Sequence, residues 1–315
     1  MLKFVVRRLV GSVPVLIGIS FITFALVSFA PGDAIRLMLG SETVNVANVE
    51  RLRLQLGLDD PWYVQFGNYM AGLVRGDLGT SITSRQPVAR QIIQRFPNTL
   101  LLTVVSMVVA LVIAIPLGVI SAAWPNRPPD YAAMFFSMAG VAMPNFWLGL
   151  VLIILFGLEL RWLPIRGMGD INNGLLSFGS HLVLPAITLG TSLAAILTRL
   201  TRNTMLDVLG EDFVRTAKAK GVRPSRVLFT HALRNAFLPI VTTAGLQFGA
   251  LLGGAVIIET IFSWPGLGLL SITAIRQRDL PMMQGSVLVF AVCFMLVTLL
   301  TDMLYAAINP RIRYV

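Results

Sequence analysis

Four polar residues interrupt long apolar runs of this 315-residue chain: Asn145, Thr243, Gln247 and Glu259. Amide, hydroxyl and carboxylate groups at such positions can hydrogen-bond a polar solute. They can equally bridge neighbouring helices, the commoner role of polar side chains in apolar helices. An ionisable residue such as Glu259 in a membrane segment is a functional candidate, and a pair with Arg276 or Arg278 is the alternative. Binding of a polar solute and bridging of neighbouring helices therefore both stay open for the four residues.

The sequence contains no recognisable catalytic, nucleotide-binding or metal motif. G-x-S-x-G, H-E-x-x-H and G-x-x-x-x-G-K-[ST] are absent. The two histidines, His181 and His231, are too few and too separated for a metal cluster, and the single Cys293 can make no internal disulfide. We therefore expect no enzyme activity and no cofactor in this chain, and ATP could act only through another chain.

The composition indicates an integral membrane protein. Hydrophobic residues make up 56% and charged residues 13% of the chain, with a mean hydropathy of +0.78, whereas soluble domains carry about 25% charged residues. Several charge-free runs reach the roughly 20 residues that a membrane-spanning helix needs, and none alternates in polarity as barrel strands do. The sequence predicts an all-α fold with six transmembrane helices, at about 9–30, 99–124, 132–158, 182–199, 236–258 and 283–304.

Prolines lie within or near several of these runs, at Pro14, Pro116, Pro144, Pro185 and Pro239. They predict kinks or span ends, which neighbouring helices can tolerate in a membrane. The first run exceeds the 7 to 15 residues of a signal-peptide core, so we interpret it as an uncleaved span.

The basic residues predict the orientation. If the N-terminus is cytoplasmic, six spans place the C-terminus, the 124–131 turn and the 200–235 insert on the same side. These segments with their flanking span ends hold 14 basic and five acidic residues, a net of +9, and the opposite side holds 11 and 10, a net of +1. The accumulation of basic residues on the cytoplasmic side thus explains the formal charge of +10 without a nucleic-acid partner.

Residues 31–97 form the largest segment expected on the outer side. They contain three short stretches with helical spacing, "VANVERLRLQLGL", "WYVQFGNYMAGLVRG" and "PVARQIIQRF", separated by Pro and Gly. A packed cap over the spans and a docking surface for an external partner are the two interpretations. No short-period repeat or low-complexity linker is visible, so the sequence predicts one domain, 1–315.

The basic insert 200–235 predicts a helix, a sharp turn and a second helix. Residues 207–220 favour a helix, with Glu211 and Asp212 early and Lys218 and Lys220 late, as the helix dipole prefers. Gly221 stands where a left-handed residue would end that helix. Pro224 can begin the next, because its missing N–H needs no partner there. A basic helix resting on anionic lipid is the simpler interpretation of this segment.

The spacing of the insert resembles the coupling loop of ABC-importer permeases, the EAA loop. Arg215, Thr216 and Ala217 stand at the E-A-A positions, Gly221 at the glycine, and His231, Ala232, Leu233 and Arg234 at I-x-L-P. "RTAKAKG" and "HALRNA" are similar to the variant found in peptide and nickel permeases. "GDLGTS", "AMPNFWLGL", "ETIFSWPGLG" and "DMLYAAINPRIRY" extend the resemblance over essentially the whole chain.

This resemblance implies a type I permease fold, the first (B-type) permease of a dipeptide, oligopeptide, nickel or glutathione importer in a bacterial inner membrane. It implies four kinds of partner: membrane lipid, a second permease, two cytoplasmic ATPase subunits that hold ATP and Mg, and an extracytoplasmic binding protein. The insert would couple the spans to the ATPase. The outer loop 159–183 is short compared with dipeptide permeases, so the substrate stays open among peptides, glutathione, haem and nickel complexes.

Two other classes compete with this interpretation. A secondary transporter would need carboxylates near the membrane midplane and broken helices in matched halves, whereas charges here gather at span ends. A membrane-embedded enzyme would need a nucleophile, base or metal set. Association with an ATPase discriminates the permease from both.

Overall fold

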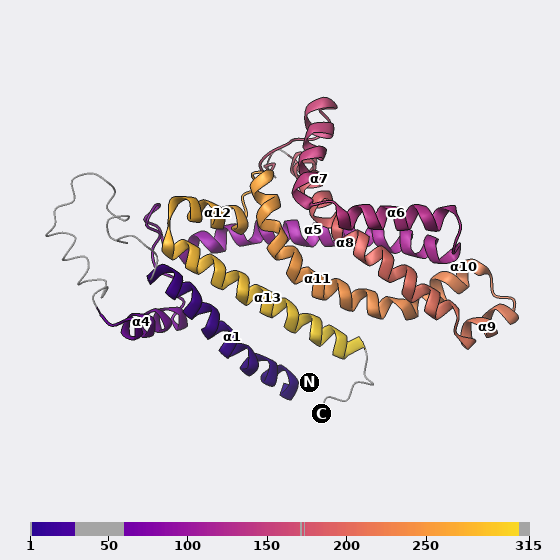
Figure 1. Ribbon diagram of the computed structural model, residues 1–315, viewed down its shortest axis with the longest axis horizontal. Coiled ribbons are helices and arrows are strands. Elements are labelled where there is room, and N and C mark those ends of the chain that lie inside the picture. Colours follow the sequence, from indigo (N-terminus) through magenta and orange to yellow (C-terminus); the bar gives the residue numbers. More distant parts are fainter. Residues whose placement is uncertain (1, 29–59, 171, 173, 309–315) are drawn as a thin grey trace. The chain divides into compact units, whose positions relative to one another are not determined.

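The computed structural model describes residues 2–28, 60–170, 172 and 174–308, and its regular elements in these ranges are helices (Figure 1). The expected helix at 46–58 lies outside the described residues. The elements are α1 (Leu2–Ser28), α4 (Trp62–Val74), α5 (Val88–Ala123), α6 (Pro128–Ala142), α7 (Asn145–Leu152), the π-helix η1 (Ile153–Glu159), α8 (Leu175–Leu209), α9 (Asp212–Ala219), α10 (Pro224–Arg226), the π-helix η3 (Val227–Ala232), α11 (Leu233–Ile261), α12 (Leu267–Gln277) and α13 (Leu280–Ile308).

The helices confirm an all-α membrane fold. Five stretches within them are long and apolar enough to cross a bilayer: Val6–Ala25, Val88–Ala123, Leu175–Leu209, Pro224–Ile261 and Leu280–Met303. A sixth candidate is a pair of helices bent by 105°, Pro128–Ala142 and Asn145–Glu159. The predicted number of six is reached when this bent pair counts as one span.

The third predicted span, 132–158, is divided at its proline. α6 ends at Ala142, Met143 is extended with ψ 124°, and Pro144 directly precedes α7. Proline disfavours the helical conformation in the residue before it and cannot donate to the preceding turn. Figure 1 shows α7 turned away from the direction of α6. Pro144 is therefore a helix end, one of the two outcomes that the sequence left open.

The other prolines stay inside helices. Pro14, Pro116, Pro185 and Pro239 lie within α1, α5, α8 and α11, respectively. The expected separate short helix at 87–96 was wrong, because residues 88–123 form one 36-residue helix, α5, that continues through Pro97. A proline removes one hydrogen bond of the helix, and contacts in the folded protein can outweigh that loss.

The chain forms two compact units, Met1–Pro97 with Leu269–Met295, and Asn98–Gly268 with Leu296–Val315. In the first unit α4 contacts α1 through aromatic rings. The centroid of the Phe66 ring lies 5.4 Å from the ring centroids of both Phe21 and Phe24. The buried Asp279 carboxylate accepts hydrogen bonds from the Ser81 hydroxyl and from the Ile82 and Thr83 amides. Asp279 thus fixes the loop before α5 to the start of α13.

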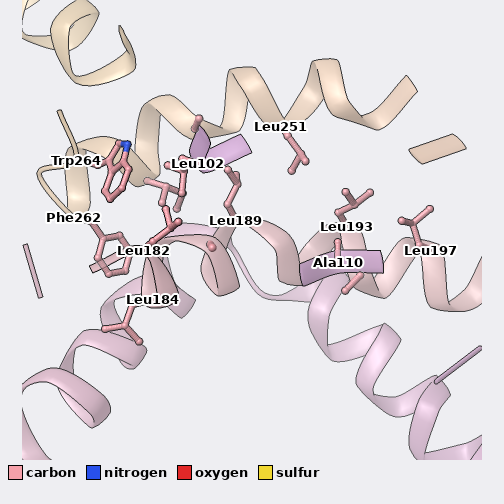
Figure 2. Close-up of a cluster of buried hydrophobic side chains, with 14 of the residues drawn as sticks. Leu102, Ala110, Leu182, Leu184, Leu189, Leu193, Leu197, Leu251, Phe262 and Trp264 are labelled. Carbon is pink, nitrogen blue, oxygen red and sulfur yellow. The ribbon is translucent and has the colours of Figure 1, made fainter. Parts of the chain in front are cut away.

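The second unit is built around α8, which contacts α6, α7 and α11. Buried side chains from α5, α8 and α11 form its main apolar core, with Phe262 and Trp264 at one end (Figure 2). Close helix approach depends on small residues: a Cβ at Gly190 of α8 would lie 2.6 Å from the Ser106 carbonyl oxygen of α5. This unit contains the insert and the four polar candidates.

Candidate coupling and translocation sites

The insert begins at Gly210, after the end of α8, and not at residue 200 as the sequence predicted. α8 runs on to Leu209, well past the expected span end at 199, and α9 starts only at Asp212. The predicted continuous helix over 207–220 was wrong, because Glu211 is extended with ψ 149° and separates the two helices. Gly210, a poor helix former, precedes this break. Val214 of α9 is fully buried, so packing in the folded unit also contributes to the direction of α9.

The turn after α9 confirms the prediction for Gly221. Its φ is +74°, the left-handed region, and its amide donates to the Lys218 carbonyl at 3.0 Å. The Val222 amide closes the same turn on the Ala217 carbonyl at 3.2 Å. Pro224 occupies the first turn of α10, as predicted. The insert therefore has the expected helix, turn and helix, and the second helix continues through η3 into α11.

The predicted coupling residues fall into two sets with different burial. Arg215 and Thr216 of α9 are exposed, and the exposed Phe213 ring lies on the same short helix. The Arg215–Asp212 ion pair spans 3.4 Å with both side chains largely in solvent, so it contributes little stability. Of the second set, His231 and Ala232 lie in η3 and Leu233 and Arg234 begin α11; Ala232 is buried and Arg234 exposed.

Ala232 belongs to an apolar cluster at the root of the insert, which the sequence did not reveal. The cluster joins α5, α8, η3 and α11 through Val119, Ala122, Met205, Ala232, Ala236 and Ile240. Met205 lies just before the insert and Ala232 at its end, so the cluster holds both ends of the insert together. Alanine is a weak hydrophobic signal in a sequence, and only its burial identifies these positions.

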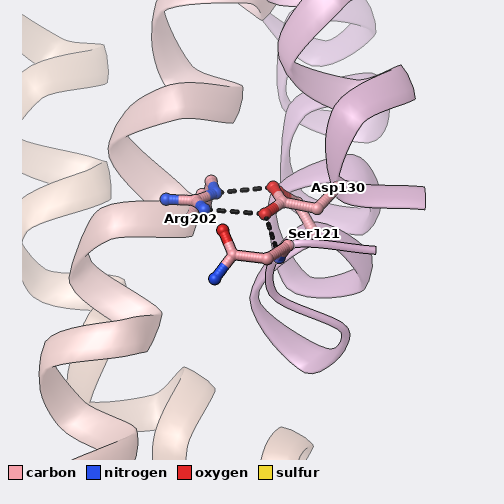
Figure 3. A network of polar contacts seen from close by, with 4 residues as sticks. Ser121, Asp130 and Arg202 are labelled. Atoms are coloured by element: carbon pink, nitrogen blue, oxygen red, sulfur yellow. Dashed lines mark hydrogen bonds and ion pairs between the residues drawn. The ribbon is translucent and has the colours of Figure 1, made fainter. Parts of the chain in front are cut away.

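A buried ion pair lies next to this cluster, and sequence reasoning missed it too. The Arg202 guanidinium on α8 donates to both carboxylate oxygens of Asp130, at 2.6 and 2.7 Å (Figure 3). The Asn126 backbone amide donates to the same carboxylate at 2.8 Å, and the Ser121 hydroxyl donates to it at 2.5 Å. Bidentate guanidinium–carboxylate pairs fix orientation as well as distance. The network ties α8 to the turn between α5 and α6.

Three of the four polar candidates are half-buried on two neighbouring helices. Asn145 begins α7, while Thr243 and Gln247 lie four residues apart on one face of α11. α7 and α11 contact each other. The structure thus places the three on adjacent elements of one unit, and their role in a path stays a prediction.

Glu259, the fourth candidate, bridges helices. It is fully buried, and the Thr99 hydroxyl of α5 donates to its carboxylate at 2.6 Å. The same hydroxyl accepts from the Leu267 amide at 2.7 Å. A Cβ on Gly266 would collide with the carboxylate, so the turn after α11 fits closely around it. Both arginines suggested as partners, Arg276 and Arg278, are exposed.

Neighbouring polar contacts complete this turn. The Asn98 side chain donates to the Pro265 carbonyl at 2.8 Å, and the Trp264 indole donates to the Asn98 carbonyl at 3.0 Å. Trp264 is buried, so its N–H requires such a partner. The start of the α5 portion in this unit and the turn between α11 and α12 are therefore joined by hydrogen bonds in both directions.

The comparisons with known proteins identify the family. Residues 114–314 match the family described as binding-protein-dependent transport system inner membrane component, and residues 1–103 match the N-terminal part of such membrane components. The chain belongs to this family of ABC-importer permeases. It is a membrane component of a transport system, without catalytic activity of its own, and the secondary transporter and the membrane enzyme are set aside.

Curated relatives match over the full length. The glutathione transport system permease protein GsiC of Escherichia coli strain K12 is 46% identical over 314 residues, covering 100% of both chains, and GsiC of Shigella flexneri serotype 5b has the same identity and coverage. Among solved structures, the MetNI methionine ABC transporter in inward-facing conformations is similar with a TM-score of 0.57 and 17% identity, over 69% of this chain and 96% of that one. This structural likeness shows the fold.

Proposed function

We propose that this chain is the permease of an ATP-driven importer for glutathione or a similarly short peptide. The full-length identity of 46% with glutathione permeases carries the proposal. Half-buried amide and hydroxyl groups at Asn145, Thr243 and Gln247 suit a peptide, whose backbone needs hydrogen bonds when it leaves water. Glu259 already bridges helices within its unit, so we place the path at the other three residues.

The proposed complex has five components. A second permease completes the path, two cytoplasmic ATPase subunits hold ATP and Mg, and an extracytoplasmic binding protein delivers the substrate. The family description, which names binding-protein-dependent transport, supports this set of partners. Shifting a two-state gate from 1:99 to 99:1 requires about 5.5 kcal/mol of differential binding. ATP binding by the partner subunits supplies this free energy.

We assign the coupling contact to α9 and the residues that follow it. α9 is short, carries an exposed phenyl ring at Phe213 and exposed charge at Arg215, and is anchored through the buried Val214. The exposed Phe213 and Arg215 suit docking to a partner protein, and the buried Val214 suits transmission of the motion of α9 to the rest of the unit. Gly221 fixes the direction in which the chain returns to the membrane.

The proposed topology places both termini and the insert in the cytoplasm. Thr83 and Ser225 are exposed and lie on opposite sides in this arrangement. In a Cys293→Ser background, a cysteine at Thr83 should react with an impermeant maleimide added outside, and a cysteine at Ser225 only after the membrane is opened. Labelling of both from outside would contradict the six-span arrangement.

Transport by the assembled complex tests the function. The two permeases and two ATPase subunits are placed in proteoliposomes with ATP inside and the binding protein with labelled glutathione outside. We expect ATP-dependent accumulation that unlabelled glutathione suppresses and free amino acids do not. Uptake that persists without ATP and follows an ion gradient would overturn the proposal. Stimulation of ATP hydrolysis by a nickel complex or haem, and not by glutathione or peptides, would overturn the peptide assignment.

A further inference from the structure

The ion pair between Asp130 and Arg202 has a position in the fold that suits a role in coupling, a role that rests on the proposed function of the insert. Asp130 is 2% exposed, and the side chain of Arg202 is 19% exposed. Buried ion pairs stabilise little compared with well-packed apolar side chains, because both charges lose their hydration. A pair at this position is therefore better explained by a requirement for fixed geometry than by stability alone.

The pair lies at the base of the insert. Arg202 precedes Gly210, where α8 ends, by eight residues, a helical distance of about 12 Å. Its guanidinium reaches a carboxylate on the first turn of α6, and that carboxylate also binds the Ser121 hydroxyl at the end of α5 (Figure 3). One bidentate pair thus links three helices on the side of the unit from which α9 projects.

Beside the pair, α5 and α8 also approach each other closely. A Cβ at Gly118 of α5 would lie 2.5 Å from the Thr201 Cβ and 2.9 Å from the Thr198 carbonyl oxygen of α8. One turn further along α8, Met205 is buried in the cluster that joins α5, η3 and α11. α8 is therefore held at successive turns between Thr198 and Met205.

We propose that Asp130 and Arg202 are positioning residues that make the ends of α5, α6 and α8 respond as one block to motion of α9. Without the pair, α9 could still dock to an ATPase, but its displacement would be absorbed at the α6–α8 contact. The pair touches no substrate or nucleotide in this scheme. Its effect is confined to the ratio of transport to ATP hydrolysis.

Neutralising both Asp130 and Arg202 tests the positioning role without leaving one buried charge unpaired. Asp130→Asn or Arg202→Gln alone leaves one charge without its partner, which lowers abundance whatever the role of the pair. The double variant Asp130→Asn/Arg202→Gln removes both charges. We expect it to reach the abundance and ATPase assembly of the unsubstituted protein while transport per ATP hydrolysed falls at least about fivefold, the lower end of typical allosteric coupling.

Two further variants control the experiment. Ser137→Ala removes another α6–α8 link, the hydrogen bond from the Ser137 hydroxyl to the Ala195 carbonyl at 2.6 Å, further from the insert. The Ser137→Ala variant should show the same transport per ATP hydrolysed as the unsubstituted protein. Arg202→Lys keeps the charge and loses the planar fork. If the double variant does not assemble, Arg202→Lys should still assemble and show a reduced ratio.

A distance measurement makes the result independent of transport. Spin labels at Arg127, in the α5–α6 turn, and at Lys220, after α9, are introduced into the assembled complex in the Cys293→Ser background. We expect a narrow distance distribution with the pair present and a broad one in the double variant. A distance distribution that stays narrow without the pair would overturn the proposed positioning role. An unchanged ratio of transport to ATP hydrolysis in an assembled variant would overturn it as well. If the unsubstituted complex transports no peptide, the proposed function is wrong. The distance distribution still tests whether Asp130 and Arg202 position the helix ends.

Discussion

The two ends of α11 are held in different ways. At its start, next to the insert, α11 contributes the small side chain of Ala236 and the branched Ile240 to an apolar cluster, while Arg234 and Phe237 are exposed. At its other end Glu259, Phe262 and Trp264 are buried, and the Glu259 carboxylate lies against the turn that leads to α12. One end combines an apolar anchor with exposed surface, and the other is enclosed.

The difference separates a docking region from a fixed one. At the insert end, the apolar cluster anchors the chain while the neighbouring Arg234 and Phe237 stay exposed, so substitutions of exposed residues there leave the packing of the unit intact. The enclosed end depends on hydrogen bonds and on backbone atoms in close contact, which tolerate neither added atoms nor lost partners. We therefore expect substitutions at the enclosed end to reduce folding and abundance, and substitutions in the insert to reduce coupling in a folded protein.

The largest loss of stability is expected for Gly268→Ala. Its Cβ would lie 2.5 Å from the Val256 Cα, a backbone atom that cannot rotate away, and 2.9 Å from the Glu259 Oε2. Overpacking of this kind costs about 1–3 kcal/mol or more, so membrane abundance and the thermal unfolding temperature in detergent should both fall. Gly253→Ala is the matched control on α11, because its Cβ would meet no atom within 4 Å. Equal stability of the two variants would contradict the enclosed end.

A smaller loss is expected for Thr99→Val. The Thr99 hydroxyl both donates to Glu259 and accepts from the Leu267 amide, and leaving such buried groups without this contact costs about 1–3 kcal/mol. Thermal unfolding measures the effect. Thr103→Val should cost less, because the Thr103 hydroxyl donates within its own helix, to the Thr99 carbonyl. A larger loss for Thr103→Val would show that helix-to-turn hydrogen bonding does not hold this end.

Gly221→Val should change coupling with little loss of stability. A β-branched residue at φ +74° costs on the order of 1–2 kcal/mol, and space is available, because a Cβ there would meet no atom within 4 Å. Abundance should stay near normal while transport and substrate-stimulated ATP hydrolysis fall. Ser225→Ala, on the exposed part of the insert, is the control.

The alternative for the insert, a basic helix on anionic lipid, makes the opposite prediction for these variants. Gly221→Val would then transport normally, and neutralising Lys218 and Lys220 would matter more. Uptake measured side by side for the two sets distinguishes docking from lipid contact. Normal coupling in a well-inserted Gly221→Val protein would remove the turn from the mechanism.

The smallest effect on stability is expected for Asp212→Asn. The Asp212–Arg215 pair is almost entirely in solvent, and exposed pairs contribute about 0–1 kcal/mol. Thermal unfolding should not change measurably. A marked loss would show that α9 needs this pair to fold, and would place its stability in local charge rather than in the buried Val214.

The sequence by itself determined the features that depend on neighbours along the chain. Apolar length predicts membrane helices whatever surrounds them, and the left-handed Gly221 and the helix-starting Pro224 follow from backbone geometry within a few residues. The motif spacing predicted the family in the same way, since motifs are local and their order is fixed by the chain.

Only the tertiary structure decided how distant residues meet. Thr99 and Glu259 are 160 residues apart and Asp130 and Arg202 are 72 apart, and no periodicity links either pair. The continuation of α5 through Pro97, the late end of α8 and the break at Glu211 likewise followed packing rather than propensity. Local signals are worth tenths of a kcal/mol per residue, whereas a buried carboxylate without partners costs several, so the fold places partners where the chain alone gives no hint.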